Sequence, residues 1–341
     1  MNMVNLKARL DQLSAHRKIL VSLGIAALIV LPLFTESNYA RGVFTKILIY
    51  AIVASGLNII NGYSGQSCLG IVGFLCIGAY TGALLAINLK LPFLVCLLLT
   101  MVICAVIGFL VSLPTLKLNG MFLSIITLGF AEMMRLLALN WQSLTKGPIG
   151  LKGIPGLEIF GFRIKSGLPF YYLAMITLLV VVFALHRILN SRIGRAWISI
   201  REDQEAARSL GVEVSRYRSL NFVTGAVVCG AMGLYMAYYY RYLHPDMFSL
   251  DEGFNVLSMC IVGGSGTLIG PIVGAFIINA LTEGFRFSGE WRMVMYAVLI
   301  ITMMWMRPQG LFGTRDSVIA NTSLTAGRKR RSAKIKEKAV E

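Results

Sequence analysis

The chain has 341 residues, of which 56% are hydrophobic and 14% charged, and its formal net charge is +16. Soluble domains carry about 25% charged residues, so this composition excludes a soluble enzyme, a coiled coil and a disordered chain. We expect an all-α, polytopic bundle of membrane helices, because helices satisfy their own backbone hydrogen bonds in lipid. The basic residues are not interleaved with aromatic ones, which argues against nucleic-acid binding.

Three basic segments carry most of the excess charge. Residues 1–18 have four Lys and Arg against one acid, residues 187–218 have seven Arg against four acids, and the tail from Arg315 has eight against three. Basic segments beside apolar spans stay in the cytoplasm. We therefore expect a cytoplasmic N-terminus over 1–18, a membrane domain over 19–313 with a cytoplasmic loop at 190–216, and a cytoplasmic tail over 314–341.

Nine apolar segments follow in chain order: 19–34, 43–61, 68–89, 92–113, 121–140, 168–189, 217–242, 254–282 and 291–306. A helix needs about 20 apolar residues to cross the bilayer, so most of them are long enough. The first is short and follows basic residues, as a signal peptide does. No small-residue cleavage site follows it, so we interpret it as a retained span.

Two cytoplasmic ends require an even number of crossings, and the segment 254–282 is the candidate for crossing either twice or not at all. A straight helix of this length would measure about 43 Å, against about 30 Å of hydrocarbon. Its centre contains Gly263, Gly264, Ser265, Gly266 and Thr267, followed by Gly270 and Pro271. Since Gly and Pro interrupt helices, we expect a broken or re-entrant segment among about 8–10 spans.

A second glycine-rich interruption runs from Asn61 to Gln66 and includes Ser64. Interrupted helices often line a transport path, because their free backbone groups need polar partners. Asn61, Ser64, Gln66 and the run 263–267 are therefore candidate path residues. The alternative is a turn and close helix packing through glycine.

Two charges, Glu132 and Arg135, lie inside the segment 121–140 and share one helical face. Charges inside a membrane normally pair or face a cavity. They could bind a zwitterion, with Arg135 at its carboxylate and Glu132 at its ammonium. Alternatively, they form a structural ion pair.

No metal site, catalytic site or bound cofactor is expected in this chain. The six cysteines lie in apolar stretches without a CxxC motif, and the three histidines are scattered. A phosphate-binding Gly-x-x-x-x-Gly-Lys-Ser/Thr loop is also absent from the sequence. The chain therefore uses an ion gradient or a separate ATPase.

The loop 190–216 predicts a short helix from about 201 to 210 that ends at Gly211. Its sequence Glu205-Ala206-Ala207-x-x-x-Gly211 resembles the EAA motif through which the ATPase subunit grips the permease of ABC importers. The resemblance implies a coupling surface in place of a merely solvated loop. The residues that we assign to it are Gly194, Arg195, Arg201, Glu202, Glu205, Ala206, Ala207 and Gly211.

Four further stretches sharpen the resemblance. They are 61–66 with 77–80, 130–135 with 144–151, 263–275, and the run Arg-Pro-Gln-Gly-Leu-Phe-Gly at 307–313. In this order they resemble the branched-chain amino acid ABC transporter permeases, in particular the M-type partner of the paired H- and M-type subunits. The chain departs from the family pattern at Ile71, Lys146 and Ile149, where members often have His, Gly, and Asn or Ser.

The resemblance implies a heterodimer with a second permease, two cytoplasmic ATPase subunits that bind ATP and Mg, and an extracytoplasmic solute-binding protein, all at the bacterial inner membrane. The chain itself would form the path for branched-chain or related neutral amino acids, surrounded by membrane lipid. Import of urea, amides or aromatic acids is the alternative within the family. A gradient-driven transporter and a membrane-embedded enzyme are the alternatives outside it.

Overall fold

The computed structural model describes Pro32 and residues 37–313, with gaps at 117, 119, 160–161, 165–166, 286–290 and 308–309. The predicted N-terminus 1–18, the tail 314–341 and all of the predicted span 19–34 except Pro32 lie outside the described residues. Statements below refer to the described part of the chain.

This part is a helical bundle, which confirms the predicted fold class. Its membrane helices and their extensions are α2 (Asn38–Asn58), the π-helix η1 (Ile59–Tyr63), α3 (Ile71–Asn88), α4 (Phe93–Thr115), α5 (Met121–Asn140), α7 (Leu168–Leu189), α10 (Val214–Tyr240), α11 (Leu250–Gly263), α12 (Gly270–Gly284) and α13 (Trp291–Met306). Six helices in the described residues are long and apolar enough to cross a membrane: α2 with η1, α3, α4, α5, α7 and α10.

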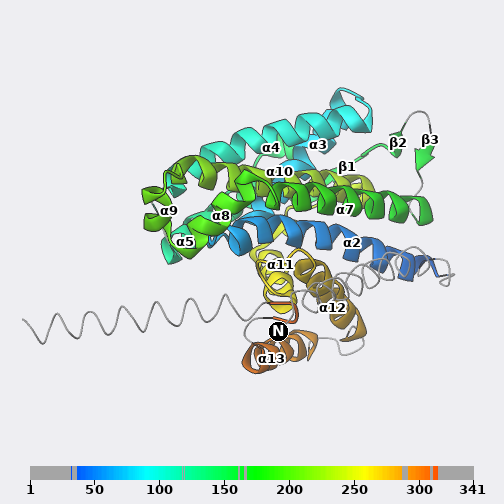
Figure 1. Ribbon diagram of the computed structural model, residues 1–341. Helices are drawn as coiled ribbons and strands as arrows, with labels where there is room; N and C mark the ends of the chain where they lie inside the picture. The colour runs from blue at the N-terminus through cyan, green and yellow to red at the C-terminus, as the bar shows by residue number, and fades with distance from the viewer. Residues whose placement is uncertain are drawn as a thin grey trace, which may run out of the picture.

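Short elements cover the two ends of the bundle. They are α6 (Gln142–Thr145), η2 (Gly147–Ile149), β1 (Leu151–Lys152), β2 (Leu157–Ile159), β3 (Phe162–Ile164), α8 (Arg192–Glu202), α9 (Gln204–Ser209), β4 (Tyr242–Leu243) and η3 (Pro245–Phe248). Strand β1 pairs antiparallel with β4, and β2 with β3. In Figure 1, α8 and α9 lie at the left end of the bundle, and β2 and β3 lie at the right. We call these the α9 end and the strand end.

Helix α10 forms the centre of the bundle and packs against α2, α3 and α4. Its contact with α3 depends on glycine, since a Cβ on Gly78 would lie 1.9 Å from the carbonyl oxygen of Gly230. Such close approach is how helices associate in lipid, where the hydrophobic effect does not drive them together. Large apolar side chains point outward on the surrounding helices, as at Leu98 on α4, Phe122 on α5 and Phe183 on α7.

The segment 254–282 is interrupted, as predicted. Helix α11 ends at Gly263 and α12 begins at Gly270, and the two helices pack against each other (Figure 1). With 14 and 15 residues they are about 21–23 Å long, which is shorter than the bilayer core. Gly274 permits the close contact, because a Cβ there would lie 1.8 Å from the carbonyl oxygen of Met259.

Candidate functional site

The loop 190–216 folds into two helices, α8 and α9, joined at Asp203. The predicted helix over 201–210 therefore differs from the structure, because Asp203 is extended, with φ −155°, and separates residues 201–202 from α9. The Asp203 carboxylate accepts hydrogen bonds from the backbone N–H groups of Glu205 at 2.8 Å and Ala206 at 3.0 Å. Capping of this kind satisfies N–H groups that have no partner inside the helix. Gly211 has φ +83° and follows the last turn.

The two adjacent alanines of α9 face opposite ways. Ala207 is 2% exposed and packs in a cluster with Ile200 and Val214, whereas Ala206 is exposed. Leu210, at the end of α9, has 83% of its surface exposed. We call the surface of Ala206 and Leu210 the α9 face. It is a small apolar surface that points away from the bundle.

The other predicted coupling residues divide between packing and surface. Gly194 is buried, and a Cβ there would lie 2.2 Å from the carbonyl oxygen of Leu189, so it allows α8 to begin close to α7. Arg195 is exposed and donates to the carbonyl of Asn190 at 3.2 Å. Glu202 and Glu205 are both exposed. Thus only part of the predicted set is accessible to a partner.

Helix α8 is anchored to the bundle by Trp197. This side chain is 1% exposed, lies in a cluster with Ile59 and Leu185, and donates from Nε1 to the carbonyl of Tyr217 at 2.9 Å. The cluster joins α8 to the ends of α2, α7 and α10. The base of the loop is therefore part of the folded bundle.

Arg201 joins α8 to the π-helix. Its Nη1 donates to the carbonyl of Gly62 at 2.6 Å. Two other backbone carbonyls of η1 also accept hydrogen bonds from outside the π-helix. The carbonyl of Ile59 accepts from Asn221 Nδ2 at 2.9 Å, and the carbonyl of Ile60 accepts from the N–H of Gln66 at 3.1 Å. Carbonyls at a helix end lack intrahelical donors, and here side chains and the following loop satisfy them.

The two predicted interruptions meet at the α9 end of the bundle. Asn58 donates from Nδ2 to the carbonyl of Thr267 at 2.8 Å, and its Oδ1 accepts from the N–H of Gly266 at 2.8 Å. The backbones lie so close that a Cβ on Gly62 would be 2.4 Å from the nitrogen of Gly266. The second interruption therefore bonds to Asn58 at the end of α2 and lies directly against the backbone of the first interruption.

The predicted polar residues of the first interruption bond within the chain. Gln66 donates from Nε2 to Ser64 Oγ at 2.9 Å and to Asn221 Oδ1 at 3.2 Å. Asn61 bonds with both the N–H and the carbonyl of Cys68, at 3.0 Å each. These contacts hold the backbone of the interruption in place.

The second interruption is held by the motif near the end of the described chain. The N–H groups of Leu311 and Phe312 donate to the carbonyls of Val262 and Gly263, both at 3.0 Å. Gly264, with φ +111°, lies against this segment. Thr267 Oγ1 donates to the carbonyl of Gly264 at 2.8 Å, while Ser265 is exposed. The segment therefore caps the free end of α11.

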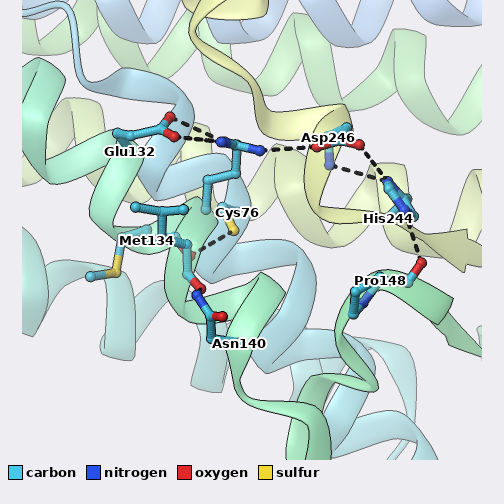
Figure 2. Close-up of polar contacts among 9 residues, drawn as sticks. Cys76, Glu132, Met134, Asn140, Pro148, His244 and Asp246 are labelled. Carbon is cyan, nitrogen blue, oxygen red and sulfur yellow. Dashed lines mark hydrogen bonds and ion pairs between the residues drawn. The ribbon is translucent and has the colours of Figure 1, made fainter.

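The predicted charged pair lies on α5, apart from the interruptions. Arg135 donates from Nε to both carboxylate oxygens of Glu132, at 3.0 and 3.1 Å, and from Nη1 to Asp246 at 3.0 Å. Figure 2 shows the line of contacts from Glu132 through this guanidinium to Asp246 and His244. The side chains of Glu132 and Arg135 keep 28% and 21% of their surface exposed. The pair thus has a third, acidic partner at η3.

The contacts continue from the charged pair to the strand end. His244 Nε2 lies 3.1 Å from the carbonyl oxygen of Pro148, and its Nδ1 lies 3.3 Å from the backbone nitrogen of Asp246 (Figure 2). A carbonyl only accepts, so Nε2 carries the hydrogen, and Nδ1 also lies 3.3 Å from Asp246 Oδ2. The chain of contacts connects the middle of α5 to the loop at η2.

The three departures from the family pattern occupy different environments. Ile71 is fully buried at the start of α3, while Ile149 is 72% exposed at the strand end. Lys146 has φ +64°, a left-handed conformation that glycine adopts without strain. A glycine, which the resemblance implies at this position, would suit that backbone better than Lys does.

The site also contains residues that the sequence analysis missed. Asn58 and Asn221 lie inside apolar segments, where the polar amide is the available signal, and Asp246 has no local signal. Among the described residues, no three His, Cys, Asp or Glu side chains lie close enough to hold a metal ion.

Comparison with known proteins gives a consistent result. Residues 39–304 match the family model described as branched-chain amino acid transport system / permease component. The high-affinity branched-chain amino acid transport system permease protein LivM of Escherichia coli K12 is 34% identical over 313 residues, which cover 84% of this chain and 74% of the relative. Its counterpart in Salmonella typhimurium is 36% identical over the same shares. The permease protein LivH of E. coli K12 is 28% identical over 42% of this chain and 44% of its own. No solved structure matches.

Proposed function

The chain belongs to the family of branched-chain amino acid transport permeases, and we propose that it is the membrane subunit of an ABC importer for branched-chain or related neutral amino acids. Two relatives that each cover most of this chain are permeases of that substrate class by name. The observation that carries the coupling part of the proposal is the α9 face. A small, exposed apolar surface, with charged residues beside it, suits docking into a groove on a separate ATPase.

A second, related permease completes the membrane part in this proposal. The names LivM and LivH among the relatives support such a pair, since both denote permeases of the same transport system. Two ATPase subunits bind ATP and Mg on the cytoplasmic side, and a solute-binding protein delivers the amino acid from outside. No covalent chemistry is assigned to this chain.

The basic loop 190–216 sets the orientation in the membrane. Under the positive-inside rule, the α9 end faces the cytoplasm and the strand end faces outward. We propose, as the basic terminal segments suggest, that both chain termini are cytoplasmic, and that the exposed apolar side chains of α4, α5 and α7 contact lipid. The proposed location is the bacterial inner membrane, where the protein would be a multi-pass subunit.

Transport follows from two conformations with different affinities for the ATPase. ATP closes the ATPase dimer, which pulls the docked α9 face, and α8 moves with it because Asp203 joins the two helices. An ATPase that binds one conformation of the permease more tightly than the other shifts the populations of the two conformations, by an amount set by the difference in affinity. The path then opens to one side at a time.

Two groups of residues are proposed to serve the path. The partly exposed Glu132 and Arg135 carry opposite charges that match the ammonium and carboxylate of an amino acid. The alternative role is structural, since the two already pair with each other and with Asp246. The predicted path residues at 61–66 and 263–267 bond mainly within the chain, so we assign them to the conformational change that opens the path.

The test is reconstitution of the complete importer in sealed vesicles, with both permeases, both ATPases and the binding protein. We expect uptake of labelled leucine that requires ATP. Uptake of labelled urea instead would place the chain with the alternative substrates of the family. Uptake driven by an ion gradient without ATP would contradict the proposal.

A further inference from the structure

The last turn of α8 reaches both interrupted helices. Arg201 is half-buried there and donates from Nη1 to the carbonyl of Gly62 in η1 at 2.6 Å. A Cβ on Gly266 would lie 2.4 Å from the same nitrogen. The guanidinium therefore rests directly on the turn between α11 and α12 while it binds the π-helix.

The second interruption is also bonded to Asn58, at the end of α2 just before the π-helix. Its amide pairs with the N–H of Gly266 and the carbonyl of Thr267, both at 2.8 Å. We call the set Asn58, Gly62, Arg201, Gly266 and Thr267 the junction. It joins three segments that are far apart in the sequence: the end of α2, the end of α8 and the turn after α11.

Building on the proposed function, we propose that Arg201 is a positioning residue that transmits the movement of the docked loop to the two interruptions. A π-helix and a glycine-rich turn are the segments of this bundle that can change shape at the lowest cost. The long helices around them are held by close packing, as at Gly78 and Gly230. A displacement of α8 therefore alters the junction and the half-helices α11 and α12.

Anchoring of α8 does not by itself account for Arg201. Trp197 already fixes the helix through a buried ring and a hydrogen bond to Tyr217, and Ser191 caps its first turn. Trp197 contacts the start of the π-helix only through apolar packing against Ile59, whereas Arg201 adds a hydrogen bond to the carbonyl of Gly62 and lies against Gly266. Its side chain is therefore suited to carry movement between the loop and the interruptions.

The first test separates transport from ATP hydrolysis in the complete reconstituted importer. In R201Q we expect the ATPase to co-purify and to hydrolyse ATP, while leucine taken up per ATP falls about fivefold or more. The control is R192Q, which removes the same charge from an exposed position on α8 and keeps the wild-type ratio. A wild-type ratio in R201Q would overturn the inference.

A second variant joins α8 to the first interruption by a covalent bond in place of the hydrogen bond. A Cβ on Gly65 would lie 3.6 Å from the Cβ of Arg201, which is within the roughly 3.5–4.5 Å that a disulfide spans. In G65C/R201C we expect the reduced protein to be uncoupled and the oxidised protein to recover most of its uptake per ATP. The single variants G65C and R201C control for oxidation of the six native cysteines, which are all buried.

The outcomes distinguish this inference from the proposed function. If wild-type and R192Q complexes do not retain an ATPase, the proposed function fails. If they retain it, and the disulfide in G65C/R201C leaves uptake per ATP as low as in the reduced protein, the transmission role of Arg201 fails alone. If R201Q does not assemble with the ATPase, but oxidised G65C/R201C recovers its uptake per ATP, the inference is supported.

Discussion

Arg201 donates a 2.6 Å hydrogen bond to the carbonyl of Gly62, although 139 residues separate the two in the sequence. One belongs to the loop that carries the EAA-like motif, and the other to a π-helix at the end of α2. The contact shows that the proposed docking loop and the first interruption form one structural unit. The loop is thus connected to the helices that it would move.

The exposed position of Ala206 predicts a selective effect on docking. In A206E, a charged and larger side chain occupies the α9 face, so we expect the ATPase no longer to co-purify while membrane insertion stays normal. Q204E adds the same charge to the same helix with little change in volume, and it should retain the ATPase. Normal co-purification with A206E would exclude the α9 face as the docking surface.

The effect of replacing Gly211 on ATPase docking is expected to depend on the shape of the new side chain. A side chain with a branched Cβ is strained at φ +83°, by about 1–2 kcal/mol. We expect G211V to weaken ATPase docking and uptake, because the last turn of α9 is displaced, whereas G211N should come close to the wild type. Equal behaviour of the two variants would show that backbone conformation at Gly211 is not what matters.

Substitution of Trp197 is expected to lower the stability of the folded protein measurably. W197F leaves the carbonyl of Tyr217 without its donor, at a cost of about 1–3 kcal/mol, and W197A should cost about 3–5 kcal/mol because it also opens a cavity. Thermal unfolding of the detergent-solubilised protein gives the comparison. W305F provides the control, since Trp305 is 86% exposed on α13. A W197F midpoint as high as that of W305F would contradict this prediction.

Part of this architecture could be predicted from the sequence, because composition and hydropathy act locally. The apolar segments 121–140 and 168–189 coincide with α5 and α7, and the glycine run at 263–270 marked the break between α11 and α12. The π-helix was not predictable, since its carbonyls depend on distant donors such as Asn221. The same holds for Asp246 beside Arg135 and for the cap on α11 from residues 311–312, because these contacts are set by the fold.

A variant of the charged pair on α5 tests whether the pair serves transport or only the structure. E132Q keeps an acceptor for Arg135, which also retains Asp246, so we expect the protein to be expressed normally. If Glu132 binds the ammonium of the substrate, leucine uptake falls because the attraction between charges is lost. D251N, an exposed carboxylate change on α11, serves as the control. Wild-type uptake by E132Q would assign the pair to structure alone.

The most direct measurement is solute accumulation in sealed vesicles, compared between the complete importer with ATP and this chain alone with a proton or sodium gradient. The account predicts that labelled leucine accumulates in the first case and that the lone chain accumulates none. Accumulation by the chain alone, without nucleotide, would contradict the claim that a separate ATPase drives transport.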